Sequence, residues 1–173
     1  MKKFNQISVG DNAQLVHKIT LNDVEKFINL TGDDNKLHFD NDFARKTEFK
    51  KPVVHGMLGA SFISTLIGTK LPGDGALWYS QTLEFLRPVR INDTVTVYAE
   101  VSSKNDKLKS IELKVEIRNQ NKHIVTKGIS KVKITELEIN EKISKVLDHT
   151  KTALVLGATG GVGKETALKL ADD

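Results

Sequence analysis

The spacing of apolar residues changes from a helical period to a strand period before the middle of the chain. In the first part, apolar residues recur at helical spacing over 21–31, and Thr20 with Asp23 resembles the capping box that begins a helix. We expect a short strand over 13–19 ahead of this helix and a short helix over 41–46 behind it. The first part of the chain is therefore predicted to be mainly helical.

Residues 56–69 contain no charged side chain and carry apolar residues on every side of a helical wheel. A helix of this kind is expected to be buried rather than amphipathic. Small residues at positions 59, 60, 61 and 64 allow it to lie close to a sheet. The sequence Leu71-Pro72-Gly73 predicts where this helix ends.

Four runs of alternating apolar and polar residues follow, over 77–85, 94–101, 111–117 and 124–134. This alternation is typical of an antiparallel sheet that is covered on one face. The alternation places Leu77, Tyr79, Gln81, Leu83 and Phe85 on one side of the first run. One buried helix followed by four long strands predicts an α+β protein. The hot-dog fold, an antiparallel sheet wrapped around a long central helix, fits this order best.

Composition narrows the possible functions. The chain of 173 residues has no Cys, which excludes disulfides, thiol nucleophiles and iron–sulfur clusters, and its five His include no helical i,i+4 pair, so no metal site is expected. Net charge is +4, but Lys and Glu interleave along segments such as 109–114. A solvated surface explains this better than nucleic-acid binding, with a phosphate-bearing small ligand as the second interpretation. Neither a membrane span nor a signal peptide is visible, so a cytoplasmic protein is predicted.

A polar loop between two predicted helices carries the first candidate for chemistry. Asp33 and His38 are five residues apart there, and a carboxylate and an imidazole that converge on one water can do acid–base work. The spacing alone fits other interpretations equally well. Asp33 also suits a turn or cap, and His38 suits a half-buried histidine whose hydrogen bonds are satisfied.

The start of the charge-free helix is the second candidate. Backbone N–H groups at a helix start lack partners within the helix and carry partial positive charge. Gly56 has no side chain, so a ligand carbonyl can approach its N–H closely, as in an oxyanion hole. Tight packing is the alternative explanation for a glycine at this position.

Together, the two segments resemble the MaoC-like, (R)-specific enoyl-CoA hydratase family. The signature of that family is a Gly-Asp-x-Asn-Pro-x-His loop, an Ala shortly afterwards and a His-Gly-Met segment that opens the central helix. These stand here as residues 32–38, Ala44 and residues 55–57, and the resemblance covers roughly 10–136. Lys36 replaces the Pro of the signature, and we expect the loop to keep its shape despite this change.

The resemblance implies a role for each matching residue. Asp33 and His38 would activate water for addition to C3 of a trans-2-enoyl thioester, giving the (R)-3-hydroxyacyl thioester. The Gly56 N–H would bind the thioester carbonyl, and the reaction would need no metal or redox cofactor. Asn35 would shape the loop, and His55 would lie at the substrate. Three helix residues would line the acyl tunnel: Phe62, Ile63 and Leu66.

The resemblance also suggests partners and leaves alternatives open. The substrate would be an acyl-CoA or an acyl carrier protein thioester, and a single hot-dog unit of this length implies a homodimer. A hot-dog thioesterase is the nearest alternative enzyme, although the spacing of Asp33 and His38 favours a hydratase. A non-catalytic module that binds acyl thioesters or mediates dimerisation is the alternative from another class, because a fold does not determine a function.

The end of the chain differs in character from the rest. We predict a hydratase domain over 1–137, a linker over 138–151 and a tail over 152–173. The tail resembles the opening of a short-chain dehydrogenase/reductase domain, with glycines at Gly157, Gly161 and Gly163. About 22 residues cannot build a dinucleotide fold, which needs several βαβ units. We therefore expect a fragment of a hydratase–reductase fusion, in which NAD(P) binds only if a complete reductase domain follows.

Overall fold

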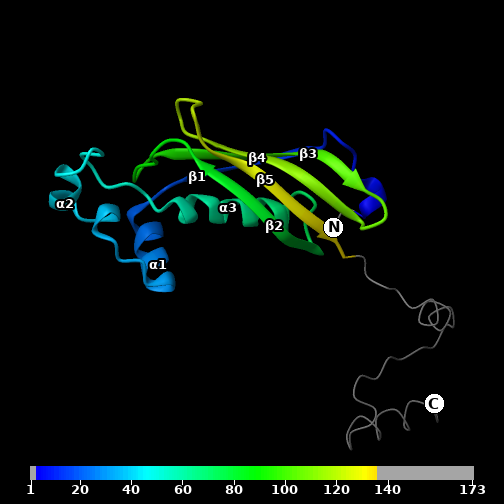
Figure 1. Ribbon diagram of the computed structural model, residues 1–173, viewed down its shortest axis with the longest axis horizontal. Helices are drawn as coiled ribbons and strands as arrows, with labels where there is room; N and C mark the ends of the chain where they lie inside the picture. Colours follow the sequence, from blue (N-terminus) through cyan, green and yellow to red (C-terminus); the bar gives the residue numbers. More distant parts are fainter. Residues whose placement is uncertain (1–2, 136–173) are drawn as a thin grey trace, which may run out of the picture. The chain divides into compact units, whose positions relative to one another are not determined.

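The computed structural model describes residues 3–135, and these form one antiparallel sheet with helices against its concave side (Figure 1). The predicted linker and tail lie outside the described residues. The five strands are ordered β1-β3-β4-β5-β2, so that β1 and β2 form the two edges. The strands are β1 (Asn12–Lys18), β2 (Ala76–Phe85), β3 (Thr94–Asn105), β4 (Ser110–Arg118) and β5 (Ile124–Ile134).

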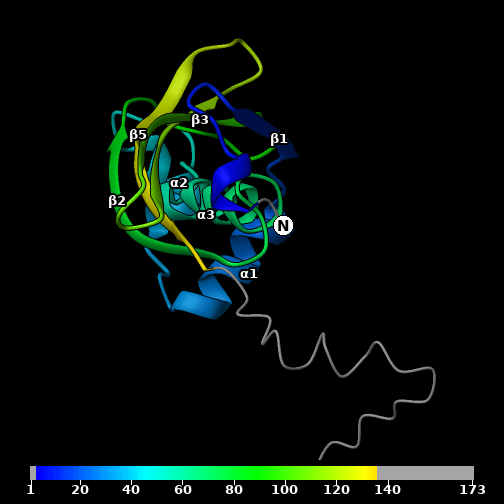
Figure 2. The ribbon, with the colours of Figure 1, turned by 90° about the vertical axis from the view of Figure 1, so that its right-hand side faces the viewer.

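The sheet curls around helix α3 (Gly56–Thr69), which Figure 2 shows nearly end-on inside the curve. Alternate residues of β3, from Val95 to Val101, are fully buried on the inner face. Ile63 and Leu66 of α3 are fully buried within the same core cluster. Burying these apolar side chains from two layers is what holds helix and sheet together. This arrangement is the α+β hot-dog fold that the sequence predicts.

Helix α3 is not buried on every side, as its charge-free sequence suggested. The face that meets the sheet is buried, but Met57, Ser61, Ser64 and Thr65 are exposed in this chain. A sheet that curls around a helix covers the part of its circumference that faces the strands. Apart from Met57, the uncovered face of α3 carries small side chains, and an apolar cavity lies along it.

Strand β2 differs from its predicted pattern in its first half and at its last residue, Phe85, which is 52% exposed. Leu77 and Tyr79 were placed on the apolar face, but they are 55% and 53% exposed. Trp78 packs against the core instead. The pairing of β2 with β5 shifts register between Trp78 and Ser80, and such an irregularity exchanges the two faces of a strand. After the shift, Leu83 packs against the core as predicted.

Helix α1 (Leu21–Thr31) begins and ends where the sequence predicts. Thr20 and Asp23 form the expected capping box, with the Asp23 N–H donating to Thr20 Oγ1 over 3.1 Å. Gly32 closes the helix with φ of 75°, a left-handed conformation that glycine adopts without strain. The chain then passes through the short turn η2 (Lys36–His38) and helix α2 (Asn41–Arg45) before it returns to α3. Within the described residues, we find no helix with the length and apolar character that a membrane crossing requires.

Candidate active site

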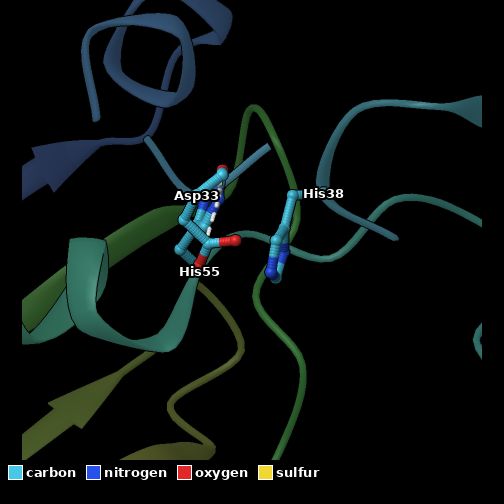
Figure 3. A group of neighbouring side chains, drawn as sticks. All are labelled: Asp33, His38 and His55. Atoms are coloured by element: carbon cyan, nitrogen blue, oxygen red, sulfur yellow. Dashed lines mark hydrogen bonds and ion pairs between the residues drawn. The ribbon is translucent and has the colours of Figure 1, made fainter. Parts of the chain in front are cut away.

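Asp33, His38 and His55 meet at the start of α3 (Figure 3). Asp33 follows the end of α1, His38 lies in η2, and His55 is the residue that precedes the first turn of α3. A carboxylate oxygen and one nitrogen from each ring lie within 4.8 Å of one another. The two residues that the sequence proposed as an acid–base pair therefore face each other across a space of about one water molecule.

The loop that carries Asp33 is fixed by its own side chains. The Asn35 N–H donates to Asp33 Oδ1 over 3.3 Å, and Asn35 Oδ1 accepts from the Leu37 N–H over 3.1 Å. Asp33 is thus a turn residue, as the alternative interpretation proposed, but its side chain is still 51% exposed and free to accept more bonds. Lys36 occupies the first position of η2, where a helical N–H needs no partner, so the position tolerates either Lys or Pro.

A backbone carbonyl fixes the protonation pattern of His38. Nδ1 of the ring lies 2.6 Å from the Val53 carbonyl oxygen. Because a carbonyl oxygen can only accept, Nδ1 carries the proton and donates, and Nε2 of the neutral ring keeps its lone pair. In this tautomer Nε2 is the basic nitrogen of His38, and one nitrogen of the ring lies within 4.8 Å of an Asp33 carboxylate oxygen.

His55 holds the other two residues in place. Its Nε2–H donates to the Asp33 backbone oxygen over 3.0 Å, and its ring stacks on His38 with 3.7 Å between centroids. Phe27 of α1 packs against the opposite side, 5.0 Å between centroids. Nδ1 of His55 is buried and has no hydrogen-bond partner. The residue lines the cavities as well, so its predicted contact with the substrate stays a prediction.

Burial lowers the pKa of His55 from its ordinary value of 6.5, because removal from water disfavours the charged ring. The unfolded chain therefore binds a proton below pH 6.5 that the folded chain still excludes, and folding stability is lost as the pH falls through that window. We expect urea unfolding to report a free energy that declines from pH 7.5 to 5.5, by at most about 1.4 kcal/mol per pH unit from this group.

His55→Gln is the matched variant for this measurement, because its amide can still donate to the Asp33 backbone oxygen. For each protein, the slope of the unfolding free energy against pH is measured. The difference between the wild-type slope and the His55→Gln slope gives the contribution of His55 apart from the other histidines. Equal slopes for the two proteins over this range would contradict the expectation.

Gly56 offers an unused donor at the first position of α3. Among the described residues, no acceptor takes its N–H. The ring of Phe85 packs directly against its Cα: a Cβ added at Gly56 would lie 2.9 Å from Phe85 Cε1. The sequence proposed either a donor or tight packing for this glycine. The structure gives it both an unpaired N–H and a close neighbour.

Gly56→Ala is expected to lower kcat/KM by about 10- to 100-fold, because the added methyl displaces Phe85 and shifts the bound substrate, although the N–H is retained. Steady-state kinetics measure the loss. The double variant Gly56→Ala/Phe85→Leu, in which the neighbour is smaller, is expected to recover most of it. A single variant with wild-type kinetics would show that the close contact is unimportant.

Two apolar cavities share lining residues at Gly56. The sheet-side cavity, about 430 Å³, lies toward Phe85, Val89 and Val125. The helix-side cavity, about 600 Å³, lies along the uncovered face of α3 toward Ser64 and Trp78. Four residues line both cavities: His38, His55, Gly56 and Met57. His38 and Gly56 thus belong to the lining of both cavities, and Asp33 lines the helix-side cavity.

The three predicted tunnel residues lie elsewhere. Ile63 and Leu66 are fully buried in the core, and Phe62 stacks on His17 with 4.2 Å between ring centroids. None of the three lines either of these cavities. The reason is that α3 turns these residues toward the sheet and toward β1, whereas the cavity follows the face that carries Ala60, Ser61 and Ser64.

The side chains of Asp33, His38 and His55 are of types that can bind a metal ion. His38 Nδ1 and His55 Nε2 are engaged as donors to backbone oxygens, and the buried Nδ1 of His55 is directed away from those bonds. A metal would therefore find two free ligand atoms, Asp33 carboxylate oxygen and His38 Nε2.

A curled antiparallel sheet around a central helix, with a carboxylate and two imidazoles gathered at the start of that helix, is the arrangement of a hot-dog protein. The protein-family model described as "MaoC like domain" matches residues 7–126 of this chain, which is well over half of its length. The chain therefore belongs to the MaoC-like family, and the predicted family, fold and enzyme class are confirmed.

Named relatives and solved structures agree with this family. An (R)-specific enoyl-CoA hydratase of Rhodospirillum rubrum is 44% identical over 99 residues, which cover 57% of this chain and 69% of the relative. An enzyme of the same name from Aeromonas caviae is 37% identical over 74% of this chain and 96% of its own. The solved structure of an (R)-hydratase from A. caviae superposes with a TM-score of 0.72 at 36% identity, covering 75% of this chain and 98% of that one.

Proposed function

We propose that this chain hydrates trans-2-enoyl thioesters to (R)-3-hydroxyacyl thioesters, and runs the reverse dehydration at the same site. One observation carries the proposal. The Asp33 carboxylate and the His38 ring lie together at the start of α3, and His38 and Gly56, whose N–H is unpaired, line both apolar cavities. The relatives named above support the same reaction.

The reacting groups divide the work between charge and proton transfer. The Gly56 N–H binds the thioester oxygen and stabilises the enolate-like charge that forms there, assisted by the positive end of α3. Water held between Asp33 and His38 adds its oxygen to C3. The pair takes one proton from that water and returns one to C2. The elements of water are added without net oxidation, so this step consumes no nicotinamide.

Two cavities suit a substrate with two arms. With the thioester carbonyl at Gly56, the acyl group occupies one cavity, and the thiol carrier that remains attached to it extends through the other. The carrier is either coenzyme A or an acyl carrier protein, because both present the same pantetheine arm. The homodimer expected from the resemblance remains a prediction.

A hydration assay tests the function directly. Crotonyl-CoA is expected to lose its enoyl absorbance without release of free thiol, and chiral chromatography is expected to find the (R)-3-hydroxy product. Release of thiol would indicate a thioesterase, and loss of absorbance with an (S)-product would contradict the stereochemistry. Saturable binding of crotonyl-CoA with no turnover would favour the non-catalytic module.

A further inference from the structure

We propose that Arg90 is a positioning residue that fixes His38 in its reactive arrangement by clamping the segment between α2 and α3. This segment, residues 49–54, is called the strap. Arg90 lies in the connection between β2 and β3 and touches neither Asp33 nor His38 in the contacts of its guanidinium. The inference rests on the proposed function, because its consequence for turnover acts through His38.

One guanidinium satisfies three backbone carbonyls of the strap. Nη2 donates to the Phe49 oxygen over 3.0 Å, and Nη1 donates to the Pro52 oxygen over 2.9 Å and to the Lys51 oxygen. Hydrogen bonds from a charged planar donor are stronger and more directional than neutral ones. The clamp therefore fixes both the place and the orientation of the strap where it approaches the site.

The turn that carries Arg90 is itself anchored on several sides. The Arg90 N–H donates to Asp93 Oδ2 over 2.8 Å, and Gln120 Nε2 donates to Asp93 Oδ1 over 2.8 Å. Backbone bonds join the same turn to the end of β1: Ile19 N–H to the Asp93 oxygen, and Asn92 N–H to the Ile19 oxygen. Arg90 thus connects the strap to a rigid part of the sheet.

The strap contains the residue that orients His38. Val53 follows the clamped Pro52 directly, and its carbonyl accepts the bond from His38 Nδ1 over 2.6 Å. The Val53 N–H donates to the Leu37 oxygen over 3.1 Å. The Val53 carbonyl shares a peptide plane with the Val54 N–H, which donates to the Val89 oxygen over 2.8 Å, so this peptide is anchored on the segment that carries Arg90. Loss of the three Arg90 bonds would leave this single anchor on that segment, and the looser carbonyl would hold the proton on His38 Nδ1 less firmly.

The test uses Arg90→Gln and Arg90→Lys, both in the full chain. We expect Arg90→Gln to lower kcat for crotonyl-CoA by about 10- to 100-fold with a smaller change in KM, because the reacting base is misplaced whereas the helix-side cavity contains no strap residue. Arg90→Lys should fall between Arg90→Gln and wild type, since an ammonium is a single charge without the fork. Nitrogen-15 spectra of labelled histidine, assigned with His38→Asn, should show His38 changing from one tautomer to a mixture.

Arg118→Gln is the matched control, because Arg118 forms an ion pair with Glu116 near the surface and contacts no part of the strap. It is expected to keep wild-type kcat and the wild-type His38 spectrum. If Arg90→Gln fails to fold, Arg90→Lys carries the same comparison.

Each other result has a defined meaning. Folded Arg90 variants with wild-type kcat and an unchanged His38 spectrum would overturn the inference, and so would variants that only lose thermal stability. A wild-type protein that hydrates no enoyl thioester, with a His38 spectrum that still responds to Arg90→Gln, would reject the proposed function and keep the placement of His38 by Arg90.

Discussion

Asp33→Asn is expected to lower kcat for enoyl-thioester hydration by about 10³-fold, with little change in the thermal midpoint. The amide has nearly the shape of the carboxylate and can still accept the Asn35 N–H at the Oδ1 position, so the turn is kept. It cannot take a proton from water, and it removes the negative charge that faces His38. Steady-state kinetics with crotonyl-CoA, alongside thermal unfolding, measure the two effects separately.

The neighbouring carboxylate supplies the control for this substitution. Asp34 is exposed, and its side chain belongs to neither cavity. Asp34→Asn makes the same chemical change one residue away and is expected to leave kcat within about twofold. If Asp33→Asn and Asp34→Asn lose the same few-fold activity, the carboxylate at position 33 is not part of the reacting pair.

His38→Asn is expected to lower kcat by about 10²- to 10⁴-fold. The side-chain amide nitrogen of Asn lies near the position of Nδ1, so it can keep the bond to the Val53 oxygen, whereas the basic Nε2 is lost. Rapid-mixing kinetics would locate the loss in the chemical step rather than in substrate binding. The double variant with Asp33→Asn is expected to be scarcely slower than either single one, because the two groups act as a unit.

The exposed His123, in the turn between β4 and β5, provides a control of the same type. His123→Asn is expected to match the wild type. A His38→Asn enzyme that retains more than about a tenth of wild-type kcat would assign the proton transfers to a group other than this imidazole.

Local patterns were sufficient to predict most elements of the fold. The Thr20 capping box, Gly32 and the charge-free run that begins at Gly56 each determine a helix boundary through contacts within a few residues. The inner face of β2 was not predictable in the same way. The register shift after Trp78 depends on pairing with β5, and the alternation in the strand's own sequence contains no sign of it.

In the candidate site, too, the local features were predictable from the sequence and the long-range contacts were not. The motif predicted the residues that converge, Asp33, His38 and Gly56, because all three lie on one stretch of chain. It did not predict that Phe85 packs on Gly56 or that Arg90 clamps the strap. Both contacts join segments more than 25 residues apart, and neither residue has a distinctive local pattern.

The strand order has a consequence for biosynthesis. The edge strand β1 pairs with β3, and the edge strand β2 pairs with β5. Each edge strand is therefore synthesised well before the strand with which it pairs. The residues of the proposed site, Asp33 to Gly56, are synthesised in the first third of the chain. Val125, which lines the sheet-side cavity, and β5, which pairs with β2, are synthesised about 70 residues later. The sheet that covers the apolar helix α3 is therefore incomplete until β5 is synthesised, and apolar surface exposed in that interval favours aggregation.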